Sequence, residues 1–392
     1  MTSAPPTVAS LRAVTREVDP GVDLFAHFDA DGFAWLHHRT RFVAHGVAAR
    51  LRPSESAAAL AALETDDPVG LPGTGPVAFG ALPFDPDAEG ELVVPARVHG
   101  ELDGRAWVTE IGPAPAAAAS ASAAPARFTV GAPRTRDQWE LAVQHALAAI
   151  DRGELEKVVP AREVLVEADT AFDAREVLRG LVAHQPGSYV YAVEGFVGAS
   201  PELLLRRMGS TVESKPVAGT TVADNDESLR ALAASVKDNR EHRYVVESIA
   251  SALADECDDL VVAATPHVEI FGPLAHLATP LRGHLHDGAR TALDLARRLH
   301  PTPAVGGTPR ADALAAIREL EGFDRGRYAG PVGWVDARGD GEWAIALRGA
   351  ELDGTRARLV AGAGIVAGSE PAAEWAETQA KLEPMLRALV RP

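Results

Sequence analysis

Two Asp-Gly pairs near the C-terminal end of the chain constrain its fold most. The pairs at 340–341 and 353–354 separate three runs of strand-forming residues, at 331–336, 342–349 and 357–361. Because Asp-Gly favours the tight turns of β-hairpins, these runs predict an antiparallel meander. Hairpin-connected strands combined with long helices favour an α+β sandwich over a doubly wound parallel sheet.

Patterns of helices and strands also mark the middle of the chain. Thr135 and Gln138 form a capping box that opens a helix with apolar residues at helical spacing, and a second long helix is expected over 227–254. Strands are expected over 157–166, 188–194 and 203–207. Pro160 lies inside the first of these strands, and since proline cannot donate a ladder hydrogen bond, we expect an edge or a bulge there.

The last helix carries a polar stripe. Ser369 can cap this helix, and at 100° per residue Glu374, Glu377 and Lys381 fall on one side of it. Two carboxylates and an ammonium on one stripe could bind a divalent cation and an anion side by side. The alternative is an ordinary solvated Glu–Lys pair. Pro384 lies inside this helix and predicts a kink or an early end.

Composition excludes several functional classes. The 392 residues carry a formal net charge of −17, which disfavours nonspecific binding to nucleic acid or to anionic membranes. A single cysteine, Cys257, excludes an intrachain disulfide and a multi-thiolate metal site. We find neither the pattern of a secretory signal at the start nor a run of about 18 apolar residues. A cytoplasmic protein is therefore expected.

Three weaker signals point to chemistry. Glu202 has apolar neighbours, which raise the pKa of a carboxyl group. The glycines of Gly362-Ala363-Gly364 precede the last helix, where backbone N–H groups could cradle an anion. On the predicted middle strand of the meander, Arg348 shares a face with Glu342. Spacing alone supports no more than metal-assisted chemistry on an anionic substrate.

Longer segments carry a family resemblance. In order they are KVVPAR (157–162), ASPELLL (199–205), KPVAGT (215–220), KDNREHRYVV (237–246), HLATPLRG (276–283), LHPTPAVGGTP (299–309), RGRYAGPVGW (325–334), AIALRGA (344–350) and AGAGIVAGSEPAAEWAETQAKL (361–382). With them the chain resembles the chorismate-utilising enzymes: isochorismate, salicylate, anthranilate and aminodeoxychorismate synthases.

This resemblance implies an organisation for the whole chain. The expected fold is a large two-subdomain α/β sandwich of the α+β class, with the active site in the cleft between its sheets. Residues 1–111 look like the family's divergent N-terminal portion, residues 112–127 are an Ala/Pro/Ser-rich surface loop, and residues 128–392 are the chorismate-binding catalytic region. The family's stand-alone members imply a monomer without a glutaminase subunit.

The resemblance also assigns roles to single residues. Glu241 and Glu377 look like magnesium ligands, with Glu374 nearby and acting through water, which suits a hard cation that prefers oxygen. Lys157 matches the general base that activates water, and Glu202 matches the general acid that protonates the departing C4 hydroxyl. The groups that resemble the family's chorismate-binding residues are Thr220, His276, Ala304, Tyr328, Arg348, Lys381 and the backbone of Gly362, Ala363 and Gly364.

These matches favour an isochorismate synthase that feeds siderophore or menaquinone biosynthesis. Anthranilate synthases usually carry Gln in the place of Lys157, and aminodeoxychorismate synthases carry a nucleophilic lysine in the place of Ala218. Salicylate synthase, which goes on to eliminate pyruvate, is the main alternative and carries threonine where this chain has Ala304. A non-catalytic chorismate-binding protein would lack an acid, a base or a metal ligand, and none is missing here.

Two departures from the family pattern stand out. The stretch after AGT reads TVADND and lacks the arginine common there, and GGTPR lacks the lysine that several relatives have after GxP. The contacts of the first loop are therefore in doubt. Neither departure touches the acid, base or metal positions.

Overall fold

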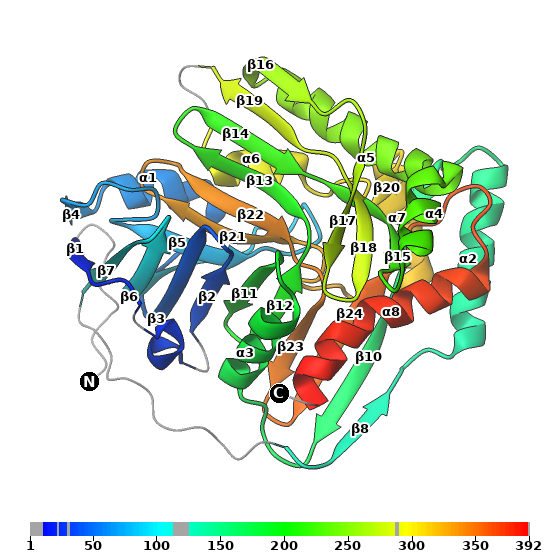
Figure 1. Cartoon of the computed structure of the whole chain (residues 1–392), viewed down its shortest axis with the longest axis horizontal. Coiled ribbons are helices and arrows are strands. Elements are labelled where there is room, and N and C mark those ends of the chain that lie inside the picture. Colours follow the sequence, from blue (N-terminus) through cyan, green and yellow to red (C-terminus); the bar gives the residue numbers. More distant parts are fainter. Residues whose placement is uncertain (1–10, 22, 30–31, 113–124, 287–289, 391–392) are drawn as a thin grey trace.

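Strand pairing runs through both the N-terminal and the C-terminal part of the chain. The computed structural model describes residues 11–21, 23–29, 32–112, 125–286 and 290–390. Its N-terminal ladder consists, in pairing order, of β4 (Glu64–Asp66), β1 (Arg12–Val18), β7 (Arg105–Ile111), β6 (Leu92–Leu102) and β3 (Thr40–Leu51). Two arms of strands extend from this ladder (Figure 1).

The two arms form the layers of the sandwich. The first arm continues from β3 through β2 (Phe33–Leu36), β11 (Tyr189–Val193), β12 (Phe196–Ser200), β23 (Gly349–Asp353), β24 (Arg356–Gly362), β10 (Ala161–Ala168) and β8 (Phe128–Gly131). The second arm continues from β6 through β5 (Val77–Ala81), β21 (Pro331–Asp336), β22 (Gly341–Ile345), β13 (Leu203–Met208), β14 (Thr211–Lys215), β19 (Leu281–Leu285) and β16 (Cys257–Val262).

Two small ladders stand beside the arms. One consists of β15 (Val217–Val222), β18 (Leu274–Ala278) and β17 (His267–Phe271), and the other of β9 (Lys157–Val158) and β20 (Gly307–Thr308).

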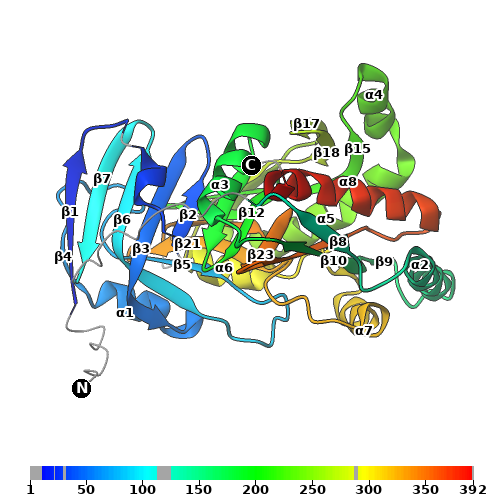
Figure 2. The same ribbon diagram turned by 90° about the horizontal axis from the view of Figure 1, so that it is seen from below.

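Helices cover the outer faces of both arms (Figure 2). α3 (Ala174–His184) and α8 (Pro371–Val390) pack on the first arm, and α6 (Ala292–Leu299) packs on the second. The remaining helices are α1 (Ser56–Ala61), α2 (Arg136–Asp151), α4 (Asp226–Ala234), α5 (Val236–Ala254), α7 (Arg310–Glu321) and the short η2 (Leu24–His27) and η3 (Pro53–Glu55). The α+β class is confirmed. Within the described ranges, we find no helix with the length and apolarity that a membrane span needs.

An aromatic core fills the space between the layers. The ring of Phe42 meets Trp107 and Trp334 edge-on, with centroid distances of 5.8 and 4.9 Å. The buried carboxylate of Glu342 accepts hydrogen bonds from Trp35 Nε1 (2.7 Å) and Arg206 Nε (2.6 Å). Through these bonds, Glu342 on β22 connects Trp35 on β2 of the first arm with Arg206 on β13 of the second arm.

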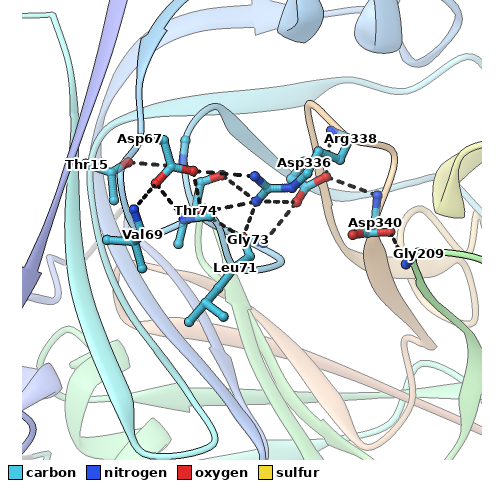
Figure 3. Close-up of polar contacts among 12 residues, drawn as sticks. Thr15, Asp67, Val69, Leu71, Gly73, Thr74, Gly209, Asp336, Arg338 and Asp340 are labelled. Carbon is cyan, nitrogen blue, oxygen red and sulfur yellow. Dashed lines mark hydrogen bonds and ion pairs between the residues drawn. The ribbon is translucent and has the colours of Figure 1, made fainter.

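A second polar cluster joins the N-terminal part to the hairpin of β21 and β22 (Figure 3). The buried carboxylate of Asp336 accepts hydrogen bonds from the N–H groups of Gly73 (3.0 Å), Arg338 (2.8 Å) and Asp340 (3.0 Å). The guanidinium of Arg338 then reaches back to Asp67, at 3.4 Å. The division of the chain at 112–127 stays a prediction, and most of that segment, residues 113–124, lies outside the described residues.

Several local predictions are confirmed, and one helix is corrected. The capping box of Thr135 and Gln138 is present, and strands form where 188–194 and 203–207 predict them. The single helix expected over 227–254 is wrong, because Ser235 has extended backbone angles and separates α4 from α5. Its side chain accepts the N–H of Asp238, so the interruption is itself the N-cap of α5.

The strand expected over 157–166 is interrupted at Val159 and Pro160. β9 ends before Pro160 and β10 begins after it. β10 pairs with both β24 and β8, so it is not an edge strand. The missing N–H of proline therefore divides this strand and does not move it to the edge of the sheet.

The predicted meander is wrong in its middle strand. β22 ends at Ile345, and Arg348 adopts left-handed backbone angles with φ of 51°. The chain then starts β23 at Gly349 in the other arm, where a Cβ would lie 2.5 Å from the Tyr191 hydroxyl. Arg348 therefore lies at the crossing between the two layers, not on a strand face with Glu342.

The early end allowed for the last helix is also wrong. α8 continues through Pro384 to Val390. Leu382, Met385 and Leu389 are buried in the core that α8 shares with α3 and the first arm. Burial of this apolar face outweighs the hydrogen bond that Pro384 cannot make.

Candidate active site

A cavity of about 50 Å³ lies where β15, β18, α5 and α8 meet the crossing between the layers. Its lining includes the predicted site residues Glu202, Thr220, Glu241, His276, Ala304, Tyr328, Arg348, Gly362, Gly364 and Lys381. It also includes Ala218, which served above to separate the family members, and residues that the sequence did not single out, namely Val159, Pro201, Val217, Gly219, Val305 and Leu347. Because ligand pockets commonly reach 300–1,000 Å³, a ring-sized ligand requires side chains here to move.

Lys157 and Glu241 form an ion pair beside the cavity, which Glu241 lines and Lys157 does not. Lys157 on β9 is fully buried, and its Nζ lies 2.9 Å from Oε1 of Glu241 on α5. Burial alone would raise the pKa of Glu241, but the charge and hydrogen bond of Lys157, together with the charges of Lys381 and Lys237, hold that pKa below its ordinary value. A Cβ at position 364 would lie 2.1 Å from Oε1 of Glu241, so this contact requires Gly364.

Glu202 lies between β12 and β13 and is 1% exposed. Burial raises the pKa of its carboxyl group to about 8, although the charge of Lys157 and the N–H of Val217 both act to lower it. The direction agrees with the apolar neighbours in the sequence. Glu202 therefore keeps its proton at neutral pH and is able to donate it.

The network around His276 fixes its tautomer. Burial, assisted by the charge of Arg348, lowers the pKa of His276 to about 3, so the ring is neutral. Nδ1 donates to the carbonyl oxygen of Gly219 at 2.9 Å, and Thr220 Oγ1 lies 3.3 Å from the same nitrogen. Nε2 is consequently the acceptor, and Nη2 of Arg348 donates to it at 3.3 Å. We assign this tautomer from the hydrogen-bond partners.

Arg348 and Lys381 give one end of the cavity a positive charge. Over the described ranges, Arg348 has no carboxylate within ion-pair distance, and it is held in the left-handed conformation noted above. Lys381 donates to the carbonyl oxygen of Gly362 (3.1 Å) and to Glu377 (2.6 Å). Tyr328 is buried beside Gly362. A carboxylate ligand is the natural complement of such a surface.

The backbone of Gly362, Ala363 and Gly364 is only partly available to a ligand. Gly362 and Gly364 line the cavity, whereas Ala363 does not. The N–H of Ala363 donates to the carbonyl oxygen of Pro160 at 3.1 Å, and its methyl group is buried in the core. The structure therefore places Ala363 in the frame behind the cavity.

Each of the three predicted metal-binding carboxylates has its own lysine. Glu241 contacts Lys157 at 2.9 Å, Glu374 accepts from Lys237 at 2.6 Å and Glu377 accepts from Lys381 at 2.6 Å. Glu374 and Glu377 do not line the cavity itself. In the part of the chain that the structure describes, no three acidic, histidine or cysteine side chains are already arranged as a metal centre.

The donor set nevertheless fits a hard divalent cation. Burial raises the pKa of Glu374, and the charge of Glu377 raises it further. Burial acts to lower the pKa of Lys237, but the charges of Glu374, Glu377 and Glu241 raise it above its ordinary value. The Lys237 ammonium therefore interacts with all three carboxylates. Clustered, partly buried carboxylates that require positive charge are suitable ligands for Mg²⁺.

Sequence reasoning missed Lys237 and the buried pair Glu321–Arg325. Lys237 begins one of the segments that resemble the family, but 137 positions separate it from Glu374. Arg325 likewise begins the RGRYAGPVGW segment. Both Lys237 and Arg325 belong to segments that resemble the family, and this membership could have marked them as functional. No rule based on spacing along the chain identifies their ion-pair partners.

Sequence comparison places this chain among related proteins. Residues 110–390 match the family model described as "Chorismate binding enzyme". A Mycobacterium tuberculosis protein provisionally named isochorismate synthase MenF is 42% identical over 91% of this chain and 95% of its own length. The isochorismate synthase MenF of Bacillus subtilis is 37% identical over 80% of this chain and 75% of its own length.

Solved structures show the same architecture. DhbC of Bacillus anthracis, provisionally titled a 2,3-dihydroxybenzoate-specific isochorismate synthase, superposes with a TM-score of 0.82 at 32% identity, covering 93% of this chain and 98% of its own. The menaquinone-specific isochorismate synthase MenF of Escherichia coli has a TM-score of 0.83 at 24% identity, covering 100% and 97%, which shows the shared fold. The chain is therefore a member of the chorismate-binding enzyme family.

Proposed function

We propose that this protein is an isochorismate synthase that converts chorismate reversibly to isochorismate. The observation that carries the proposal is the placement of Glu202 in the cavity wall and of Lys157 against Glu241, which lines the same cavity. Lys157 has the chemistry of a base, and Glu202 has a pKa raised to about 8 that suits an acid. The relatives named isochorismate synthases support the same reaction.

The proposed reaction needs one proton removed and one supplied. Lys157 takes a proton from the water that adds to C2 of chorismate, while the ring double bonds shift. Glu202 gives its proton to the C4 hydroxyl, which leaves as water. Burial serves Glu202, because it disfavours the charged carboxylate and so keeps the proton on the acid. Each group typically contributes about 10²–10⁴-fold to the rate.

Substrate binding is proposed to use the positive end of the cavity. Arg348 and Lys381 would hold the carboxylates of chorismate, and Tyr328 would add a hydroxyl donor. Neutral His276 accepts from Arg348 and so orients the guanidinium. Glu241, Glu377 and Glu374 would hold Mg²⁺, which when bound neutralises carboxylate charge beside the ring. We extend the proposal to a cytoplasmic monomer that acts without a glutaminase subunit.

Salicylate synthase is the alternative within the same chemistry. Ala304 lines the cavity with a methyl group where the resemblance to salicylate synthases calls for a threonine hydroxyl. The absence of that hydroxyl favours a reaction that stops after water addition. The product would feed siderophore or menaquinone biosynthesis, and the names of the relatives include both a menaquinone-specific and a 2,3-dihydroxybenzoate-specific enzyme.

Product analysis tests the proposal. Purified protein is incubated with chorismate and Mg²⁺, and the products are separated by chromatography with mass detection. A new species isobaric with chorismate, without pyruvate, is the expected result. Stoichiometric pyruvate with salicylate would move the assignment to salicylate synthase. No conversion under any metal or ammonia condition would leave a chorismate-binding protein.

A further inference from the structure

A fully buried ion pair lies directly behind the candidate site. Glu321 ends α7, and Arg325 follows four residues later, in the loop before Tyr328. Their side chains are 1% and 3% exposed, and Nε of Arg325 donates to Oε2 of Glu321 at 2.9 Å. Neither residue lines the cavity.

The pair holds the chain on both sides of the interruption after β9. Nη2 of Arg325 donates to the carbonyl oxygen of Val159, and Oε1 of Glu321 accepts the N–H of Ala161 at 2.7 Å. Pro160, between them, has no N–H to fix its own position. The segment that leads from Lys157 into β10 is therefore anchored by this pair at the point where it leaves the ladder.

The same guanidinium reaches two other parts of the site. Nη1 of Arg325 donates to the carbonyl oxygen of Val305 at 2.8 Å, next to Ala304 in the cavity wall. Its charged carbon lies 4.1 Å from the ring centroid of Phe84 and 5.7 Å from that of Tyr328. One side chain thus contacts the segment after Lys157, the Ala304 wall and Tyr328.

Stability alone does not account for this arrangement. A buried ion pair contributes little stability relative to apolar residues of similar volume, because both charges lose their hydration. The planar fork of arginine, however, presents several donors in fixed directions, and an ammonium does not. Here those donors are directed to Glu321 and to the backbone at Val159 and Val305.

We propose that Glu321 and Arg325 form a positioning unit that sets the place of Lys157 and of the Ala304 wall relative to Tyr328. The unit does not touch the substrate. The proposal rests on the proposed function, since Lys157 is taken as the base. Displacement of a catalytic group by about 1 Å can cost about 100-fold in rate, which sets the expected size of the effect.

The kinetic test uses two variants and a matched control. In the double variant Glu321→Gln, Arg325→Met both charges are removed together, so no single charge is left buried. Arg325→Lys keeps the charge without the fork. We expect kcat for isochorismate formation to fall about 100-fold in both variants, while KM changes less than about threefold. Keeping the positive charge in Arg325→Lys should therefore restore little of the lost rate.

The control is the other buried arginine–glutamate pair, Arg206–Glu342, which lies in the aromatic core and not at the cavity. Arg206→Met, Glu342→Gln should change the melting temperature while kcat stays near that of the wild type. If kcat in the Glu321 and Arg325 variants stayed near that of the wild type, as in this control, with only the melting temperature changed, the positioning role would be overturned.

Hydrogen exchange provides a test that needs no turnover. In Arg325→Lys we expect faster exchange of the amides of Val159, Ala161 and residues 305–306, with unchanged protection in the centre of β10. Unchanged exchange at those amides would overturn the proposal even if the protein proved to be a salicylate synthase. Faster exchange in Arg325→Lys, together with a wild type that makes no isochorismate, would refute the proposed function and leave the positioning role supported.

Discussion

Nζ of Lys157, which is fully buried, and Oε1 of Glu241, whose side chain is 12% exposed, lie 2.9 Å apart. One residue comes from the short strand β9 and the other from the middle of α5. Removal of either would leave the other as an uncompensated buried charge, so the two positions are linked both in stability and in the proposed chemistry. Variants at either position must therefore be read with stability measured beside activity.

Lys157→Ala should abolish turnover, because Lys157 is the proposed base for the water that adds to C2. The expected loss in kcat is at least about 10²–10⁴-fold. The double variant Lys157→Met, Glu241→Gln separates folding from chemistry, since it leaves no unpaired charge. A near wild-type rate in a folded Lys157→Ala protein would show that another group is the base.

Glu202→Gln should also abolish turnover, since glutamine has no proton to give to the departing hydroxyl. In the wild type, the acid form of Glu202 is needed, and its pKa is about 8. kcat/KM should therefore decline as the pH rises above about 8. A pH–rate profile measures this directly, and a flat profile between pH 7 and 9.5 would exclude Glu202 as the acid.

The stability of the protein should carry the same signature. The pKa of Glu202 is raised from 4.5 in an ordinary glutamate to about 8 by burial, so folding favours the protonated form. The stability that this preference contributes is present below pH 4.5 and is lost as the pH rises to about 8. Relative to the wild type, the melting temperature of Glu202→Gln should thus increase between pH 6 and pH 9. Parallel curves would contradict the raised pKa.

Metal removal should stop the reaction. We expect EDTA to abolish turnover and excess Mg²⁺ to restore it, with loss of Mg²⁺ binding by calorimetry in Glu377→Ala. Lys237→Met removes the counter-charge of Glu374 and should cost about 1–3 kcal/mol in the metal-free protein. Mg²⁺ should then raise the melting temperature of this variant more than that of the wild type. Arg152→Met, at the exposed pair with Glu154, is the control without such a response.

Gly364→Ala should inactivate the protein without unfolding it. The new methyl group would lie 2.1 Å from Oε1 of Glu241 and 3.2 Å from Cε of Lys157, so both side chains must move. We expect kcat to fall about 100-fold, as for a displaced catalytic group. Gly131→Ala, at an exposed position of β8 with open space around it and no left-handed backbone angle, is the control for an added methyl group. Full activity of Gly364→Ala would show that the Lys157–Glu241 contact is dispensable.

The elements with strong local signals were predictable. The capping box at Thr135 depends on side chains three positions apart, and the strands around Tyr189 and Leu203 depend on short apolar runs. At Ser235 and after Ile345, the periodic patterns predicted that a helix and a strand continue, whereas each element ends there in the structure. In both places a single residue, Ser235 or Arg348, has non-helical or left-handed angles that a periodic pattern does not reveal.

The candidate site was likewise predicted in part. The resemblance named most of the cavity lining, including Glu202, Arg348 and Lys381. It did not show that the N–H of Ala363 donates to the carbonyl oxygen of Pro160, nor that Lys237 forms an ion pair with Glu374. Those facts depend on which polar groups are left without water after folding, and on which partners then lie within hydrogen-bond distance.

Neighbouring residues along the chain were enough to predict the α+β class, the helix caps and the chemical types available at the site. Three features became known only from the packing of distant segments: Lys157 meets Glu241, Arg348 lies at the crossing of the layers, and Arg325 holds the chain beside Pro160. The physical reason is that a buried charge must find its counterpart wherever packing brings one, and packing joins residues that no local pattern connects.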